Sequence, residues 1–227
     1  RTKASVQEFF LSIPKRLRRT VQSVCSDLYQ GFIGAAKAVF GKRVHICADR
    51  FHVAKLYRNG LENLRKSEWK RLCHILSEEE RKSFKNVHWL LRQRRADLNA
   101  DERRMLNRLF RYSPKLQEAY EACESLTAIY ESRLSKGQGK RKLRGWMERV
   151  TNRKLSCFDS FLGTLNTHFE EVTNYFIGRH TSGFVEGLNN KIKVIKRRCY
   201  GITNLGHLYQ RICLDLNGYD RFGVDTL

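Results

Sequence analysis

The chain has 227 residues, and its 44 lysines and arginines against 23 acidic residues give a formal net charge of +21. This excess predicts a polyanionic partner, most simply DNA or RNA, because neutralising phosphates releases their counterions. No apolar run approaches the roughly 20 residues that span a bilayer, and no signal peptide is visible, so a membrane protein is disfavoured. The seven scattered cysteines form no C-x-x-C pair, which indicates a reducing, cytoplasmic location without disulfides or structural zinc.

A strand, a helix and a second strand are predicted after a first helical segment at residues 4–18. Residues 21–26 predict a short strand that ends at Asp27, and residues 44–48 predict another that ends at Asp49. Such a unit forms a right-handed crossover between parallel strands. Ligands of open α/β sheets gather at the carboxyl ends of strands. The two aspartates are therefore expected where the chemistry of such folds is usually carried out.

Residues 53–178 change to a helical pattern. Helix start signals occur at Ser77, Asn99 and Ser113. The glycines within residues 137–140 predict a flexible break, and residues 155–177 predict one long helix with an apolar stripe. A last helix is expected at residues 204–217.

Residues 182–198 predict an amphipathic helix with one carboxylate, Glu186, near its start. Its apolar side chains recur at helical spacing and are expected to face a core; they are Phe184, Leu188, Ile192 and Ile195. Its cations, here called the basic ridge, are Lys191, Lys193, Lys196, Arg197 and Arg198. A carboxylate beside a cationic ridge suits a metal ion held next to a phosphate backbone. This pattern predicts an enzyme that acts on nucleic acid.

Cleavage and transfer of phosphodiesters can use two hard cations about 3.5–4 Å apart, held by carboxylate oxygens. Asp27 and Glu186 are the candidate ligands. Each has an ordinary alternative: an aspartate before a helix commonly caps it, and a first-turn glutamate complements the helix dipole. Asp49 and His52 form a D-x-x-H group that could position a metal, or Asp49 could cap the next helix while His52 is solvated. These residue types alone favour the ordinary roles.

Three blocks of sequence resemble the DDE transposase domain of the ISL-three insertion-sequence family. They are S-D-L-Y-Q-G-F, H-I-C-A-D-R-F-H-V and V-E-G-L-N-N-K-I-K-V-I-K-R-R-C-Y-G-I-T-N, in order over nearly the whole chain. The resemblance implies an α+β, mostly helical fold, in which a partial ribonuclease-H-like core with a short βαβ unit carries a large all-α insertion. It also implies cutting and joining of transposon-end DNA with Mg²⁺ or Mn²⁺ in a two-metal site held by an acidic triad.

The resemblance assigns roles to the acidic residues. Asp27 matches the aspartate of the strand before the helical crossover, and Glu186 matches the final glutamate, so both are expected to be catalytic metal ligands. Asp49 and His52 match an accessory block beside the site. The fold's first catalytic aspartate belongs on an earlier strand, and no such strand is predicted before Asp27. Residues 1–20 contain one acidic residue, Glu8, which lies in the expected helical segment. We therefore expect a C-terminal part of a transposase that is inactive, or nearly so, by itself. In the alternative assignment, Asp27, Asp49 and Glu186 form the whole catalytic triad.

Three domains are expected from this resemblance. Residues 1–52 would form the partial core, residues 53–178 the helical insertion, and residues 179–227 the C-terminal core helices with the final acidic residue and the basic ridge. The expected partners are transposon-end and target DNA and further copies of the chain, with no membrane, in the bacterial cytoplasm at the nucleoid. The alternative function is a catalytically inactive, transposase-derived DNA-binding module. A structural RNA-binding protein is disfavoured because no aromatic strand platform is evident.

Overall fold

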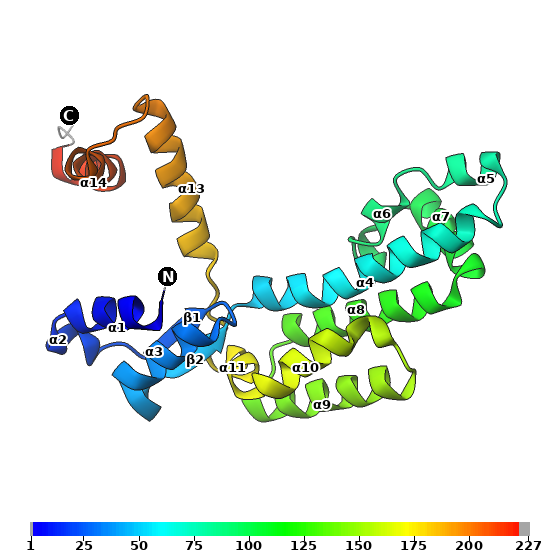
Figure 1. Ribbon diagram of the computed structural model, residues 1–227, viewed down its shortest axis with the longest axis horizontal. Coiled ribbons are helices and arrows are strands. Elements are labelled where there is room, and N and C mark those ends of the chain that lie inside the picture. Colours follow the sequence, from blue (N-terminus) through cyan, green and yellow to red (C-terminus); the bar gives the residue numbers. More distant parts are fainter. Residues whose placement is uncertain (1, 223–227) are drawn as a thin grey trace. The chain divides into compact units, whose positions relative to one another are not determined.

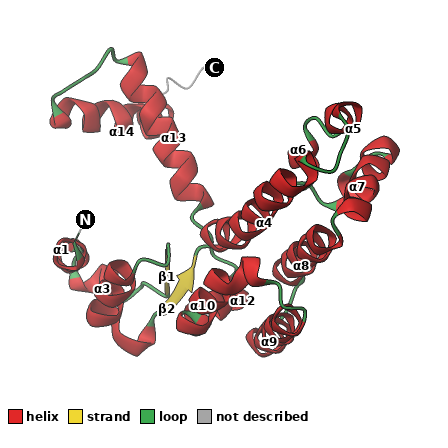
Figure 2. Cartoon of the chain, turned by 45° about the vertical axis from the view of Figure 1, so that its right-hand side comes forward, coloured by secondary structure: helices red, strands yellow, loops and turns green. Residues whose placement is uncertain are grey.

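A small parallel sheet begins the fold. The computed structural model describes residues 2–222, without the side chains of residues 217–222, and it separates after His180 into two compact units. In the first unit, β1 (Ser23–Ser26) and β2 (His45–Ala48) pair in parallel. The helix α3 (Gln30–Phe40) joins them, as Figure 2 shows beside the yellow strand. This arrangement confirms the predicted strand, helix and strand.

The N-terminal helical segment is broken, and the prediction of one helix over residues 4–18 is wrong. Helix α1 (Lys3–Ser12) ends before Pro14, and the short α2 (Lys15–Arg18) follows it. Proline lacks a backbone donor and disfavours helical backbone in the residue before it. Ile13 accordingly adopts an extended conformation with ψ 127°.

A helical array follows the sheet within the first unit. The long α4 (Arg50–Cys73) runs from the sheet toward α5, α6 and α7, and α8 lies along it (Figure 1). The remaining helices are α5 (Glu78–Ser83), α6 (Val87–Leu90), α7 (Ala100–Tyr112), α8 (Pro114–Glu131), α9 (Lys136–Asn152), α10 (Asp159–Thr167), α11 (Phe169–Thr173) and α12 (Tyr175–Gly178). Single 3₁₀ turns occur at η1 (Gly41–Arg43), η2 (Arg95–Asp97) and η3 (Ser156–Phe158).

The predicted helix starts are confirmed, because the side chains of Ser77, Asn99 and Ser113 accept hydrogen bonds from free N–H groups of the turns that follow. The prediction of a flexible break at residues 137–140 is wrong. Ser135 caps α9, which runs unbroken through those glycines.

The prediction of a single helix at residues 155–177 is also wrong. This segment is divided into η3, α10, α11 and α12 by contacts with distant parts of the chain. His168 lies 3.2 Å from the Gln30 amide nitrogen, and the Asn174 amide donates to the carbonyl of Ile46 at 2.8 Å. Both residues stand at junctions between the short helices. Because these bonds tie the segment to α3 and β2, one straight helix cannot satisfy them.

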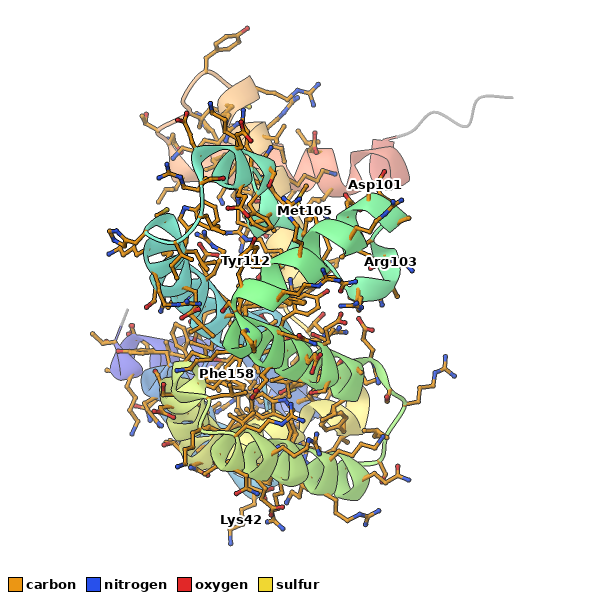
Figure 3. All side chains as sticks on the ribbon, turned by 90° about the vertical axis from the view of Figure 1, so that its right-hand side faces the viewer. Lys42, Asp101, Arg103, Met105, Tyr112 and Phe158 are labelled. Atoms are coloured by element: carbon orange, nitrogen blue, oxygen red, sulfur yellow. The ribbon has the colours of Figure 1, made fainter. Side chains whose placement is uncertain are left out.

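The main core fills the space between the helices and extends to β2. Trp146 is 1% exposed, and its ring meets those of Phe158 and Phe161 edge to face at 5.7 Å between centroids. Phe158 lies among the helices in Figure 3, whereas Lys42 and Asp101 lie at the periphery. Helices therefore dominate, and with the two-stranded sheet they confirm the mostly helical α+β class. The ribonuclease-H-like topology stays a prediction.

A glycine sets the distance between α4 and the turn η3. A Cβ at Gly60 would lie 2.4 Å from the backbone oxygen of Cys157, which cannot rotate away. Gly60→Ala is expected to lower the free energy of unfolding by about 1–3 kcal/mol, as overpacking does. Gly163→Ala is the matched control, since a Cβ added at Gly163 would have nothing within 4 Å. This variant should raise the free energy of unfolding by roughly 0.5–1 kcal/mol. Urea midpoints measure both, and equal midpoints would contradict the close packing.

The second unit contains α13 (Gly183–Arg198) and α14 (Leu205–Phe222), which confirm the two predicted C-terminal helices. Ile195 is buried at 3% exposure, as predicted. Phe184 is 82% exposed, so the second unit does not cover it, and the prediction that it faces a core is wrong for this unit. No helix in the described part of the chain is long and apolar enough to cross a membrane.

Candidate functional site

The carboxyl ends of β1 and β2 lie side by side and bring two aspartates to one sheet edge. Ser26 stands opposite Ala48, the last paired residue of each strand. The next N–H, that of Asp49, donates to the Ser26 carbonyl at 2.8 Å and extends the ladder. Asp27 and Asp49 thus each follow directly on the last pair. This is the edge where ligands bind in open α/β sheets.

Asp27 does not cap the helix that follows it. The helix α3 has Tyr29 at its cap position and no side-chain cap bond. The Oδ1 atom of Asp27 instead accepts a hydrogen bond from the Tyr29 N–H at 3.2 Å, within the turn that precedes α3. No hydrogen bond to Oδ2 of Asp27 occurs among the described residues. The ordinary role that the sequence favoured is therefore not the role in the structure, and one carboxylate oxygen stays available.

Asp49 and His52 form a pair at the start of α4. Asp49 is 0% exposed and stands at the cap position of α4, yet its side chain makes no cap bond. Its Oδ2 lies 2.7 Å from Nδ1 of His52, whose side chain is 47% exposed. A buried carboxylate needs such a partner, because desolvation disfavours an unpaired charge. Asp49 thus orients the imidazole, and the alternative of a merely solvated His52 beside a capping aspartate is not what the structure shows.

Polar residues of α11 and its flank join this segment to α3 and β2, and the local sequence pattern did not predict these contacts. Glu171 is buried and forms a 2.7 Å ion pair with Lys37 of α3. Asn174 binds β2 through the carbonyl of Ile46. The available signal was that Glu171 and Asn174 stand beside residues of the apolar stripe predicted at residues 155–177, where a buried polar group needs a specific partner.

Glu186 lies in the first turn of α13, in the second unit. Its Oε1 accepts a hydrogen bond from the Ser182 hydroxyl at 3.1 Å, which holds the side chain at the start of the helix. Among the described residues no hydrogen bond reaches its Oε2. Because Asp27 and Glu186 belong to different units, their convergence stays a prediction.

Among the residues that the structure describes, the basic ridge divides into one paired cation and four unpaired ones. Lys191 forms an ion pair with Asp215 of α14 at 3.2 Å and so joins the two helices of its unit. The other four are exposed and have no carboxylate within ion-pair distance in the part of the chain that the structure describes; they are Lys193, Lys196, Arg197 and Arg198. The ridge therefore keeps most of its charge available to an anion.

The family model DDE_Tnp_ISL3, described as a transposase, matches residues 1–212. The chain belongs to the ISL-three family of transposases. It is also similar to the transposase for insertion sequence element IS1001 of Bordetella parapertussis, with 24% identity over 220 residues. That match covers 93% of this chain and 52% of the relative, so the chain spans about half the length of this curated transposase. No solved structure matches the chain.

The residues of the candidate site fit a hard divalent cation. Carboxylate oxygens are the ligands that Mg²⁺ and Mn²⁺ prefer. Asp27 and Glu186 each leave one oxygen without a hydrogen bond among the described residues. This donor set suits the divalent metal use that the DDE family suggests.

Proposed function

We propose that this chain forms part of the catalytic domain of a transposase that cuts and joins transposon-end DNA, with Asp27 and Glu186 as metal ligands. The observation that carries the proposal is the sheet edge, where Asp27 and Asp49 directly follow two parallel strands and neither side chain caps its helix. Membership of the ISL-three family supports the same function.

The proposed roles follow from the contacts of each residue. Bound Mg²⁺ or Mn²⁺ would activate the attacking oxygen and stabilise the leaving oxygen of the phosphodiester. Asp27 and Glu186 would hold the ion through their free oxygens. Asp49 fixes the orientation of His52 through the 2.7 Å bond, which is a positioning role beside the site.

The basic ridge is proposed to contact DNA phosphates. Its exposed lysines and arginines would contact the backbone independently of sequence, so binding should depend strongly on salt. DNA ends and target are the proposed partners, and assembly of several copies on paired ends is part of the same proposal.

Titration with Mn²⁺, followed by its electron paramagnetic resonance signal, tests the metal site. Asp27→Asn and Glu186→Gln are each expected to weaken Mn²⁺ binding by at least about 100-fold, since losing even an outer-shell partner costs roughly 10- to 100-fold. Glu79→Gln is the matched control, because Glu79 is also an exposed glutamate in the first turn of a helix. It should bind Mn²⁺ like the unmodified protein.

The other outcomes separate the alternatives. Equal binding by Asp27→Asn, Glu186→Gln and the unmodified protein would remove the metal site and leave the inactive DNA-binding module. If Asp27→Asn still binds Mn²⁺ while Asp49→Asn and Glu186→Gln do not, Asp49 rather than Asp27 is the metal ligand at the sheet edge.

A further inference from the structure

A cationic cavity lies between α4 and the turn after α6, within the first unit. Its volume is about 320 Å³. The polar side chains that line it, here called the α4 groove, are Lys55, Arg58, Asn59, Glu62, Arg65 and Arg92. None of these residues belongs to the candidate metal site or to the basic ridge.

The charges of the α4 groove do not balance. Glu62 accepts two hydrogen bonds from Arg65, at 2.7 and 2.9 Å, and this contact lowers the pKa of Glu62, so the pair is ionised and neutral in sum. Lys55, Arg58 and Arg92 have no carboxylate within ion-pair distance among the residues described. Three unpaired cations on one cavity repel each other, and an anion placed there would relieve the repulsion.

Two contacts hold the two arginines in place. The Arg58 guanidinium donates to the backbone carbonyl of Arg92 at 3.1 Å and so joins α4 to the turn after α6. The Arg92 guanidinium lies over the indole of Trp89, 5.0 Å from the ring centroid. Trp89 therefore adjoins the groove through Arg92, which lines the groove and covers part of the indole.

Trp89 is unusual among the tryptophans of this protein. It is 54% exposed, whereas Trp146 is 1% exposed and Trp69 packs partly buried against the core. A tryptophan gains much free energy from burial, so an indole that stays 54% exposed beside Arg92 needs a reason. Cations that follow a phosphate backbone, with an aromatic ring on which a base stacks, are the combination that binds single-stranded nucleic acid.

We propose that the α4 groove binds single-stranded DNA, with phosphates on Lys55, Arg58 and Arg92 and an unpaired base stacked on Trp89. Bases of an intact duplex are stacked on each other and cannot cover the indole. An unpaired stretch occurs where an end is cut or its strands separate, and in this respect the inference rests on the proposed function.

Fluorescence anisotropy with a labelled thymidine 12-mer and a labelled 20-base-pair duplex tests the proposal. Trp89→Ala is expected to weaken binding of the 12-mer by roughly 5- to 150-fold, the range for loss of one base stack, and to leave duplex binding within about twofold. Trp89→Phe should restore most of the affinity, because phenylalanine keeps a stacking face. Arg58→Ala should flatten the salt slope for the 12-mer by about 0.7, the value for one phosphate contact.

Matched variants outside the groove serve as controls. Ile75→Ala removes an exposed apolar side chain, and Lys70→Ala removes an exposed cation of α4 that has no ion pair among the described residues. Both should bind the 12-mer like the unmodified protein.

Four results would overturn the proposal. Unchanged binding of the 12-mer by Trp89→Ala would remove the stacked base. Equal weakening of 12-mer and duplex, with a lowered melting temperature, would assign the indole a purely structural role. If Lys193→Ala with Arg197→Ala weakens duplex binding while the groove variants change nothing, the proposed function stands and the groove proposal falls. Absence of DNA binding in the unmodified protein would end both.

Discussion

Fe²⁺ bound to this protein, supplied with ascorbate and hydrogen peroxide, is expected to cut the protein's own backbone in two places, near Asp27 and near Glu186. Radicals formed at a bound ion react within a short distance, so the cuts mark the segments that surround it. Asp27 follows directly on β1, and Glu186 lies in the first turn of α13, 159 positions later in the chain. Paired cuts would show that the two carboxylates hold one ion cluster.

Glu186→Gln should abolish both cuts, because removing one ligand lowers affinity for the ion by at least about 100-fold. Fragments are identified by mass spectrometry after separation. Glu79→Gln, with the same loss of charge, should keep both. Cuts confined to the neighbourhood of one carboxylate would show that the ion is held by a single unit and would contradict the convergence of Asp27 and Glu186.

Trp146→Ala is expected to lower the free energy of unfolding by about 3–5 kcal/mol, the range for truncating a large aromatic residue in a core. Trp146 is 1% exposed and contacts Phe158 and Phe161 edge to face. Its indole N–H also donates to the Ala122 carbonyl at 2.8 Å, so the variant loses a buried hydrogen bond in addition to packing. Equilibrium unfolding in urea, followed by circular dichroism, measures the change.

Trp89→Ala is the matched control for this measurement. The same side chain is removed from a position that is 54% exposed, so stability should change by no more than about 0.5 kcal/mol. Similar losses in the two variants would mean that Trp146 does not anchor the core of the helical array.

Local signals were sufficient for the sheet and for most helix starts. Short apolar runs that end in Asp27 and Asp49 predicted β1 and β2, because strand and turn residues act within a few positions. Ser77 and Asn99 predicted helix starts because a cap bond reaches only two or three residues ahead. The candidate ligands at the sheet edge followed from the same local pattern.

Contacts between distant residues explain where prediction from the sequence failed. Gly139 reads as a break, yet in the structure its missing side chain admits the ring of Phe176, which a Cβ would meet at 2.4 Å. Asn174 ends a helix because β2, 128 positions earlier, offers it a carbonyl. The α4 groove was missed for the same reason, since Lys55 and Arg92 are remote in sequence and no spacing rule joins them.

If the sheet edge and the α4 groove both contact DNA as proposed, the length of α4 sets a distance along it. From Asp49, at its start, to Arg58 the helix rises by about 13 Å at 1.5 Å per residue. At the 3.4 Å per step of a stacked strand in duplex DNA, this corresponds to about four nucleotides. A rigid rod of this kind would hold the unpaired base at a constant number of steps from the phosphate under attack, so one added helical turn, about 5.4 Å, would displace the register by one or two nucleotides.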